Sequence, residues 1–317
     1  MRKLGIITYY WPPAGGPGVQ RWLKLSKYLA RQDVELYIVT VDADKATYPL
    51  LDLGLLDDVH ENIHVTRTTT SEKFSAYKKV TGTKQVPFSG FSGEEVNVSF
   101  VQKIARFIRG NFFVPDARKG WNVHAYTAAA KLIQEYDIQH WVTTSPPHSS
   151  QMIGRRLQKN FGIHWTADFR DPWTDIYYYR KFYPLAITRW FERKLEHSVF
   201  STCDTLISVS PSWSKLYISK GATPSEKVYT ITNGFDIEDF SSILPERPEL
   251  FTITYAGTLA AQYPVADFVK ALNALGFPVK LRIIGSWDDS SRMKLESVST
   301  QVDLEFISYV PKKDLNG

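Results

Sequence analysis

The segment Asp168–Asp175 carries three carboxylates, one arginine and one tryptophan within eight residues. Charged side chains are costly to bury without partners, so these residues must pair with each other or face a polar cleft. In a cleft, the aromatic face of Trp173 would stack well against the C–H face of a sugar. The alternative is a brace in which Arg170 pairs with Asp168 or Asp171 and shapes the loop. The two roles are compatible, and both stay open here.

A second candidate ligand loop is Trp11–Arg21, which contains adjacent glycines at Gly15 and Gly16. Adjacent glycines let the backbone approach a ligand closely, and the free N–H groups at the start of the next helix can bind an anion. Pro17 suits the first turn of that helix, where its missing N–H costs nothing. An ordinary tight turn between a strand and a helix is the alternative.

The same loop matches the dinucleotide-binding fingerprint poorly. Gly16 and Gly18 supply the first G-x-G, but Arg21 occupies the place of the third glycine. Asp42, at the end of the second expected strand, could stand for the ribose-binding acid. Because the glycine pattern is broken, the sequence does not indicate a nicotinamide-dependent enzyme.

His148 is the candidate in the loop Thr144–Ser150. Ser145 is a favourable N-cap and Pro146 a favourable first helical residue, so we expect a helix to start here with His148 in its first turn. The positive end of the helix dipole disfavours protonation, which leaves a neutral imidazole able to hydrogen-bond a hydroxyl-rich ligand. A packing or surface histidine with no such role is an equally open interpretation.

The elements that must position these loops follow a βα pattern. Leu4–Tyr9 is a continuous apolar run typical of a strand buried on both faces, and Val19–Ala30 has helical spacing. With a strand at Glu35–Val41 they form a βαβ unit, which predicts a parallel sheet. Further strands are expected at Ile63–Thr66, Gln139–Thr144, Ile163–Asp168, Thr205–Val209 and Lys227–Ile231. Further helices are expected at Val98–Arg109, Asn122–Tyr136, Ser149–Asn160, Ala186–Ser201 and Ser212–Lys220.

A second series of the same kind begins near residue 248. Thr252–Gly257 and Lys280–Gly285 each predict a strand that opens a new unit. The predicted fold is therefore α/β, with an N-terminal Rossmann-like domain over residues 1–240, a linker over 241–250 and an incomplete second Rossmann-like domain over 251–317. Ligands of open α/β sheets bind beyond the carboxyl ends of the strands, so a cleft between two such domains is a natural ligand site.

Composition excludes several other classes. The 317 residues are 43% hydrophobic and 22% charged, which is ordinary for a soluble protein, and no apolar run approaches the ~20 residues that span a bilayer. The single cysteine, Cys203, excludes an internal disulfide and a cysteine-based zinc site, as suits a reducing cytosol. A net charge of +5 is compatible with acidic ligands or an anionic membrane surface. It is too modest to indicate a nucleic-acid partner without a recognisable module.

Two stretches interleave basic and aromatic residues, Lys103–Phe113 and Tyr177–Lys194. Such stretches could rest on anionic lipid headgroups or hold a lipid-linked acceptor. The sequence favours the alternative of half-buried helices whose lysines and arginines extend to the surface along their apolar stems.

Taken in order, these motifs resemble those of the family 4-like glycosyltransferases of GT-B fold. The likeness covers nearly the whole chain and is carried by Gly15–Gly16, Ser208–Ser210, Asn233–Asp236, Tyr255–Leu259 and Arg282–Gly285. The loop Asp168–Trp173 looks like that of a bacterial subgroup. The resemblance implies two facing Rossmann-like domains with the active site between them. It also implies transfer of a sugar from a nucleotide-sugar donor, generally with retention of configuration and without a required metal.

The resemblance further implies roles for individual residues. Gly15 and Gly16 would approach the donor phosphates or the acceptor. Arg170 stands where many relatives carry a histidine, so Asp171 and His148 become the nearby candidates for contacting sugar hydroxyls. The predicted catalytic residues are Asp171, His148 and Arg170. The predicted donor- or acceptor-binding residues are Gly15, Gly16, Arg21, Asp168, Trp173, Asn233, Gly257 and Thr258, of which the last two would approach the donor diphosphate.

Two departures from the family pattern affect the expected activity. Relatives often place Arg and Lys in the loop after the Gly257 position, but Thr258–Pro264 has neither. Another group, such as Arg21 or a helix N-terminus, would then have to stabilise charge on the leaving diphosphate. The paired-glutamate motif that binds the donor's ribose and sugar would lie beyond Gly317. We therefore expect a C-terminally truncated chain that is inactive alone.

The sequence thus predicts a retaining glycosyltransferase that moves a sugar from a nucleotide-sugar donor to a glycan or lipid-linked acceptor in bacterial cell-surface polysaccharide synthesis. No cofactor is expected, because the nucleotide-sugar is a co-substrate, and the resemblance implies that no metal is required. The expected location is the cytoplasm, with peripheral contact to the inner face of the membrane and no nucleic-acid partner. Two alternatives remain, a non-catalytic glycan-binding module of GT-B-like fold and a GT-B nucleotide-sugar epimerase.

Overall fold

The computed structural model describes residues 2–71, 100–221, 223–240, 248–259 and 263–310. These residues divide into two compact units, unit 1 up to Gly234 and unit 2 from Phe235 onward. Each unit is described by itself. Most of the linker predicted over 241–250 lies outside the described residues, and the proposed domain bounds stay a prediction.

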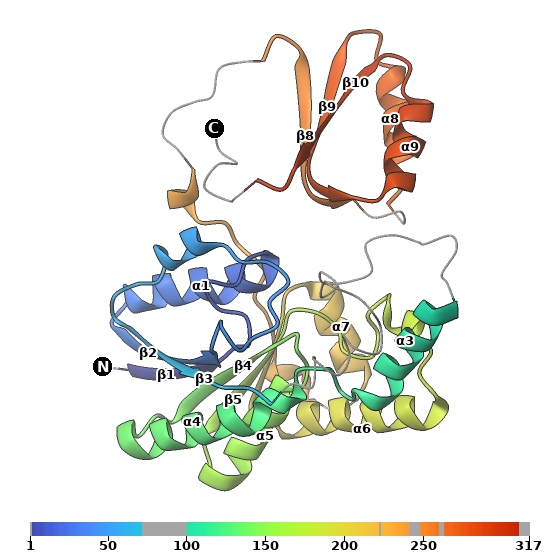
Figure 1. The fold of residues 1–317 in the computed structure, drawn as a ribbon. Coiled ribbons are helices and arrows are strands. Elements are labelled where there is room, and N and C mark those ends of the chain that lie inside the picture. Colours follow the sequence, from blue (N-terminus) through green and yellow to red (C-terminus); the bar gives the residue numbers. More distant parts are fainter. Residues whose placement is uncertain (1, 72–99, 222, 241–247, 260–262, 311–317) are drawn as a thin grey trace. The chain divides into compact units, whose positions relative to one another are not determined.

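Among the described residues, unit 1 contains a parallel sheet of seven strands in the order β3-β2-β1-β4-β5-β6-β7 (Figure 1). The strands are β1 (Arg2–Ile7), β2 (Val34–Val41), β3 (Ile63–Thr68), β4 (His140–Ser145), β5 (His164–Phe169), β6 (Thr205–Ser208) and β7 (Val228–Thr230). Neighbouring strands pair in parallel throughout. The order of the strands reverses between β1 and β4. The predicted α/β class with a parallel sheet is confirmed.

Helices connect these strands in the expected sequence. They are α1 (Pro17–Ala30), α3 (Phe100–Phe112), α4 (Asn122–Tyr136), α5 (Ser150–Phe161), α6 (Ala186–Thr202) and α7 (Pro211–Ser219). Short 3₁₀ turns are η1 (Leu53–Leu56), η2 (Lys119–Trp121), η3 (Tyr179–Phe182) and η4 (Ser225–Lys227). Helix α1 starts with Pro17 in its first turn, directly after Gly16, whose φ of 85° lies in the left-handed region that favours glycine.

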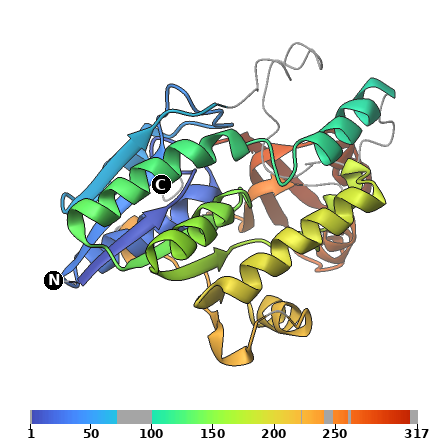
Figure 2. The ribbon, with the colours of Figure 1, turned by 90° about the horizontal axis from the view of Figure 1, so that it is seen from below.

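The sheet of unit 1 is buried on both faces, which explains its continuous apolar strands. Successive side chains of a strand point to opposite faces, so Ile6 belongs to one core cluster and Ile7 to the other. Val19 and Leu23 of α1 pack in the cluster of Ile6. Helices α4, α5 and α6 pack in the cluster of Ile7, and Figure 2 shows these three helices along one face of the sheet. Helices on both faces leave only the edges of the sheet for a ligand.

Unit 2 contains a smaller parallel sheet of three described strands in the order β10-β9-β8 (Figure 1). Its elements are η5 (Ile237–Asp239), β8 (Phe251–Leu259), α8 (Val265–Asn273), β9 (Val279–Trp287), α9 (Asp289–Val298) and β10 (Val302–Ser308). Strand β8 extends to Leu259, so Thr258 lies inside the strand and pairs with Ser286. The sequence had placed Thr258 in the loop after the strand. The longer strand follows from backbone pairing with β9, which a reading of β8 alone does not reveal.

Candidate functional site

The predicted ligand loops of unit 1 leave the sheet at one edge. Thr8–Gly16 follows β1, Pro146–Ser149 follows β4, and Arg170–Tyr178 follows β5, and these three strands are neighbours. The carboxyl ends of parallel strands lie at the same edge of a sheet. Because the strand order reverses between β1 and β4, this edge is also the switch point where open α/β sheets bind ligands.

Arg170 joins the loop after β5 to the start of α1. Its Nη1 donates a hydrogen bond of 2.6 Å to the carbonyl oxygen of Gly18, and its Nε lies 3.9 Å from Oδ2 of Asp171. The guanidinium packs close to Gly18, since a Cβ atom there would lie 3.4 Å from Nη1, at van der Waals distance. Arg170 therefore fixes both the loop and the carboxylate that follows it.

Asp171 keeps a partly exposed carboxyl group at this edge, with one third of its side chain accessible. Burial raises the pKa of Asp171, and the positive charge of Arg170 acts in the opposite direction. Burial also raises the pKa of Tyr178 to about 12, and the charge of Asp171 adds to that rise. A carboxyl group and a neutral phenol thus lie near each other, as suits hydrogen bonding to a ligand rich in hydroxyl groups.

His148 packs face to face against the indole of Trp173, with ring centroids 5.2 Å apart and an interplanar angle of 6°. Phe169 stacks against His148 as well, at 6.1 Å. Burial, followed by the charges of Arg170 and Lys220, lowers the pKa of His148 to about 3. The imidazole is therefore neutral at physiological pH. Its Nδ1 is buried and has no hydrogen-bond partner among the described residues.

The sequence-based expectation about the start of the following helix was wrong. Ser145 is not an N-cap but the last residue of β4, and its carbonyl accepts a hydrogen bond from the backbone N–H of Arg170. Its hydroxyl donates to the carbonyl of Asp168. Helix α5 begins only at Ser150, so burial and nearby cations, rather than the first turn of a helix, keep His148 neutral. Ser145 pairs with β5 as part of strand β4, although its residue type also favours a helix N-cap.

Asp168 is fully buried and makes the contacts of a brace. Its carboxylate accepts hydrogen bonds from Nη2 of Arg21 at 2.9 Å, from the indole N–H of Trp22 at 2.8 Å and from the hydroxyl of Thr144 at 2.8 Å. Arg21 also donates to Oδ1 of Asn233 at 3.0 Å. A buried ion pair is stable when further hydrogen bonds satisfy both groups. For these residues the structure shows the bracing role, and their contact with a ligand stays a prediction.

Two other predicted contact residues have a structural reason for their type. The backbone N–H of Gly15 donates to the carbonyl of Leu50, and a Cβ atom at Gly15 would lie 3.0 Å from Leu50 and 3.2 Å from Asp52. Its missing side chain therefore makes room for a neighbouring segment of the chain. Trp173 is 2% exposed and packs against His148. Contact of Gly15, Gly16 or Trp173 with a phosphate or sugar stays a prediction.

Gly257 and Thr258 lie in unit 2, near the carboxyl ends of β8 and β9. Gly257 pairs with Gly285, where a Cβ atom would lie only 2.2 Å from the carbonyl oxygen of Gly257. The hydroxyls of Thr258 and Ser286 lie 3.0 Å apart and are exposed. This edge of unit 2 offers two hydroxyl groups beside a glycine pair, and its role toward a diphosphate stays a prediction.

The structure therefore brings four of the predicted residues together, namely His148, Arg170, Asp171 and Trp173. Sequence reasoning missed Tyr178 as a neighbour of Asp171, because the residue lies in a run of three tyrosines that shows no helical or strand period. The proximity depends on how the loop after β5 folds back.

Lys220 was also missed. Its Nζ lies 2.6 Å from Glu196 of α6, 3.2 Å from the hydroxyl of Thr174, and in contact with Asp175. It fixes the far end of the loop after β5 and contributes to the low pKa of His148. The signal in the sequence was only a lysine after a helix, which is common at a C-terminus.

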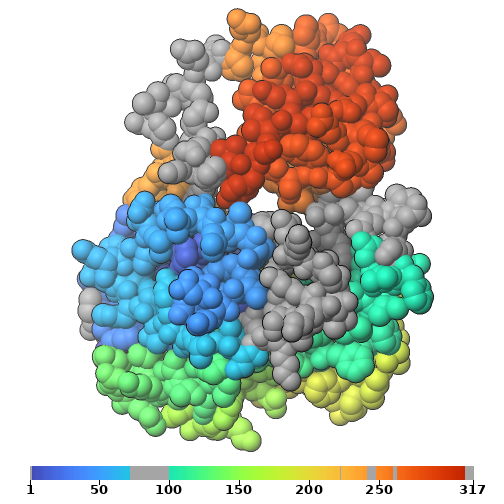
Figure 3. Space-filling view, viewed as in Figure 1, coloured from blue at the N-terminus to red at the C-terminus, as the bar shows by residue number. Residues whose placement is uncertain are grey.

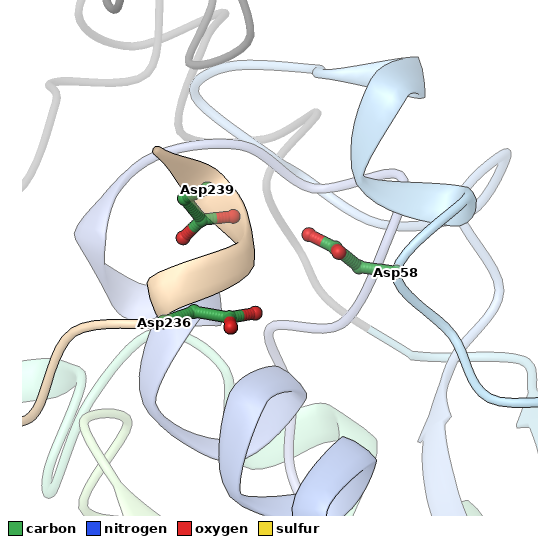
Figure 4. Close-up of side chains that lie close together, drawn as sticks. All are labelled: Asp58, Asp236 and Asp239. Carbon is green, nitrogen blue, oxygen red and sulfur yellow. The ribbon is translucent and has the colours of Figure 1, made fainter. Parts of the chain in front are cut away.

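Three acidic side chains are shown in Figure 4, Asp58 of unit 1 and Asp236 and Asp239 of unit 2. Asp58 accepts hydrogen bonds from Lys24 at 2.7 Å and from Lys27 at 3.3 Å. Asp236 caps η5 by accepting from the backbone N–H of Glu238 at 3.1 Å. Within its own unit, each of Asp58 and Asp236 thus has a structural contact. The expectation that no metal is required stays a prediction.

Solved structures similar to this one share the GT-B fold. TarM matches with a TM-score of 0.55 and 10% identity, over 100% of this chain and 78% of that chain. Anabaena HepE in complex with UDP-glucose matches with a TM-score of 0.54 and 10% identity, over 98% of this chain and 70% of that chain. The apo lipopolysaccharide outer core galactosyltransferase WaaB matches with a TM-score of 0.50 and 13% identity, over 96% of this chain and 68% of that chain. The predicted GT-B class is confirmed.

The family model of Glycosyltransferase Family 4 matches residues 18–239, which is most of the chain. The chain belongs to this family of sugar-transferring enzymes, and the predicted resemblance is confirmed. A comparison with curated proteins gives no significant match. Among the described residues, no helix is both long enough and apolar enough to cross a bilayer.

Proposed function

We propose that this chain acts as a retaining glycosyltransferase that moves a sugar from a nucleotide-sugar donor to a glycan or lipid-linked acceptor in bacterial cell-surface polysaccharide synthesis. Membership of the family supports sugar transfer. HepE was solved with UDP-glucose, and a point mutant of TarM was solved with UDP and alpha-GlcNAc-glycerol. These complexes support a nucleotide-sugar donor and a glycan acceptor for a chain of the same fold.

The observation that carries the proposal is the grouping of His148, Arg170 and Asp171 at the switch-point edge of unit 1. Asp171 offers a partly exposed carboxyl group, and Arg170 fixes its position through Gly18. His148 is held neutral and rigid by stacking on Trp173, so it can hydrogen-bond without carrying charge. In the proposed reaction these groups orient sugar hydroxyls, and catalysis comes from positioning and from stabilising the diphosphate that leaves.

Calorimetry tests the proposal directly. The chain is titrated with UDP-, GDP- and CMP-sugars, and the reaction with a glycan acceptor is followed by product analysis, including anomeric configuration. Asp171→Asn should weaken sugar binding or transfer at least about tenfold, because a positioned carboxylate contact to a ligand contributes on the order of 1.5–3 kcal/mol. Glu61→Gln, an exposed carboxylate away from this edge, serves as the matched control. No binding and no transfer across the whole panel would count against the proposal.

A non-catalytic glycan-binding module is the second candidate. The observation that favours it is the absence of any Lys or Arg from Thr258 to Pro264, where a leaving diphosphate would need positive charge. Binding of glycans without binding of any nucleotide-sugar would select this candidate. Conversion of a nucleotide-sugar without an acceptor would select a GT-B epimerase instead.

The proposal includes a cytoplasmic location with peripheral contact to the inner face of the membrane, where a lipid-linked acceptor would be reached. It also includes catalysis without a metal, as the resemblance to the family implies. Transfer measured before and after treatment with EDTA checks the second point, and loss of activity on chelation would contradict it.

A further inference from the structure

One surface of unit 1 exposes large apolar side chains in a basic setting. We name it the α3–α6 surface and define it by Phe100–Phe112 and Tyr179–Lys194. Its exposed apolar residues include Phe100, Val101 and Ile104 on α3 and Ile187, Trp190 and Phe191 on α6, each between 44% and 77% accessible. Burying apolar side chains is the main driving force for folding, so a cluster of exposed ones indicates contact with another apolar phase.

The two parts of the α3–α6 surface are fixed to each other. Asn111 of α3 accepts hydrogen bonds from the backbone N–H of Leu185 and the hydroxyl of Thr188, each at 2.8 Å. The guanidinium of Arg109 lies over the ring of Phe182, 4.7 Å from its centroid. Figures 1 and 2 show α3 beside the N-terminal part of α6, and Figure 3 shows them at one end of unit 1. The exposed residues therefore form a single surface.

The charge of this surface is strongly one-sided. The two defining segments contain eight Lys and Arg residues and a single acid, Glu192. Glu192 is 4% exposed and so contributes no accessible carboxylate. The whole chain has a net charge of only +5, so the remainder of the sequence is close to neutral or slightly acidic. Positive charge is concentrated where the apolar side chains are exposed.

Arg189 and Arg193 line two adjoining hollows on α6, one of which also includes Trp190 and Lys194. The ammonium group of Lys194 lies 4.1 Å from the ring centroid of Trp190. Among the described residues, none of these three cations forms an ion pair with a carboxylate. Unpaired guanidinium groups beside an indole fit phosphate groups at the boundary between water and hydrocarbon.

We propose that the α3–α6 surface docks on a bilayer of anionic phospholipids. The exposed aliphatic and aromatic side chains enter the boundary between headgroups and acyl chains, and the cations contact the lipid phosphates. A second copy of the chain fits this surface poorly, because two such surfaces would oppose like charges. Nucleic acid fits less well than a bilayer, because three of the exposed apolar side chains, Val101, Ile104 and Ile187, have no aromatic face for a base to stack on. The inference rests on the proposed function only for the choice of a membrane-linked acceptor.

Co-sedimentation of the full chain with vesicles tests the charge requirement. Vesicles of phosphatidylcholine are compared with vesicles that also contain phosphatidylglycerol, at low and high salt. The chain should bind the anionic vesicles more tightly, and salt should weaken that binding. The triple variant Arg189→Gln, Arg193→Gln and Lys194→Gln should bind at least about tenfold more weakly, since each cation near the membrane contributes roughly fivefold.

A matched control removes three exposed cations from α4 and α5 instead, with Lys131→Gln, Arg155→Gln and Lys159→Gln. This control changes the net charge equally and should retain the binding of the original chain. Equal loss in both triple variants would overturn the proposal, because it would show a response to net charge alone. Equal binding of the original chain to both vesicle types would overturn it too.

The apolar requirement is tested by Ile187→Ser with Phe191→Ser, which should weaken binding to anionic vesicles at low and at high salt. Leu53→Ser with Val123→Ser removes exposed apolar side chains elsewhere in unit 1 and should leave binding unchanged. Lys103→Glu on α3 is an independent variant that should also weaken binding. Circular dichroism checks that each variant is folded. Binding to RNA or self-association in place of vesicle binding would refute the inference, and neither result depends on transfer activity.

Discussion

Two neighbouring parts of the site, the end of β5 with Asp168 and the loop after β4 with His148, differ in whether their buried polar atoms have hydrogen-bond partners. On one side, the carboxylate of Asp168 accepts hydrogen bonds from Arg21, Trp22 and Thr144. On the other side, Nδ1 of His148 is buried without a hydrogen-bond partner among the described residues. Buried polar groups nearly always have hydrogen-bond partners in native proteins. The contacts of Asp168 are therefore structural, and Nδ1 of His148 marks the better place to look for ligand binding.

The largest expected effect is a loss of stability when the hydrogen-bonded carboxylate of Asp168 is removed. Asp168→Ala should lower the free energy of unfolding by about 3–5 kcal/mol, because it leaves the buried guanidinium of Arg21 without the carboxylate of its ion pair. Urea denaturation measures the change. The double variant Arg21→Met with Asp168→Leu should be less destabilised than Asp168→Ala, since no unpaired charge remains. If the double variant were the less stable of the two, the brace would depend on packing and not on charge.

A second prediction concerns Glu192, a buried acid on α6 whose Oε2 has no hydrogen-bond partner within the described residues. Burial raises the pKa of Glu192 to about 7; the nearby hydroxyl of Tyr179 acts in the opposite direction, and the charges of Asp116 and Glu196 add to the rise. The folded protein then holds a proton that the unfolded chain releases near pH 4.5, so stability is lost as pH rises through 7. Glu192→Gln should be up to about 3 kcal/mol more stable than the original chain at pH 8 and similar at pH 4.

Urea denaturation across this pH range measures the difference. Glu61→Gln, at an exposed position, should show no such pH-dependent gain. An unchanged stability of Glu192→Gln at pH 8 would mean that the carboxylate of Glu192 has a hydrogen-bond or charge partner. Glu192 would then no longer differ from Asp168 in this respect.

The third prediction concerns the pH dependence of His148. Its pKa is lowered to about 3, mainly by burial, so the unfolded chain binds a proton that the folded protein does not. The free energy of unfolding should therefore fall as pH decreases from 6.5 toward 3, by up to about 1.4 kcal/mol per pH unit from this group. His148→Phe keeps an aromatic ring against Trp173 and should remove this part of the slope. His140→Gln, at an exposed position, should leave the slope unchanged and serves as the control.

Much of the fold was predictable because its signals are local. A continuous apolar run located β1 and helical spacing located α1, and the range expected for α4 agrees with the observed helix at both ends. The strand β10 (Val302–Ser308) was not predicted, although Val302, Leu304 and Phe306 alternate with Asp303 and Glu305, which is a local signal of a half-buried strand. Ser145 was misassigned as a cap because pairing between β4 and β5 is not visible in a local window. Non-local backbone pairing is what the sequence did not disclose.

The sequence predicted where the candidate site lies but not which of its residues have a structural role and which are free to bind a ligand. A dense run of charge after a strand located the loop from Asp168 to Asp175. Whether a carboxylate in that run braces or binds depends on donors distant in sequence, such as Trp22 and Thr144, which reach Asp168 only in the fold. The density of charged residues therefore located the candidate site, but only the hydrogen bonds of the folded protein distinguish its structural carboxylates from those free to bind a ligand.

The smallest expected change in stability, from Asp171→Asn, makes the comparison sharpest. One third of the Asp171 side chain is exposed, and its oxygen lies 3.9 Å from Arg170, so loss of this pair should change the free energy of unfolding by less than about 1 kcal/mol. The same variant should nevertheless weaken sugar binding in calorimetry at least about tenfold. Asp168→Ala, refolded or assayed at low temperature, should show the reverse pattern of large instability with retained affinity per folded molecule. If both variants lost stability and affinity in proportion, the loop after β5 would be one structural unit without a separate binding side.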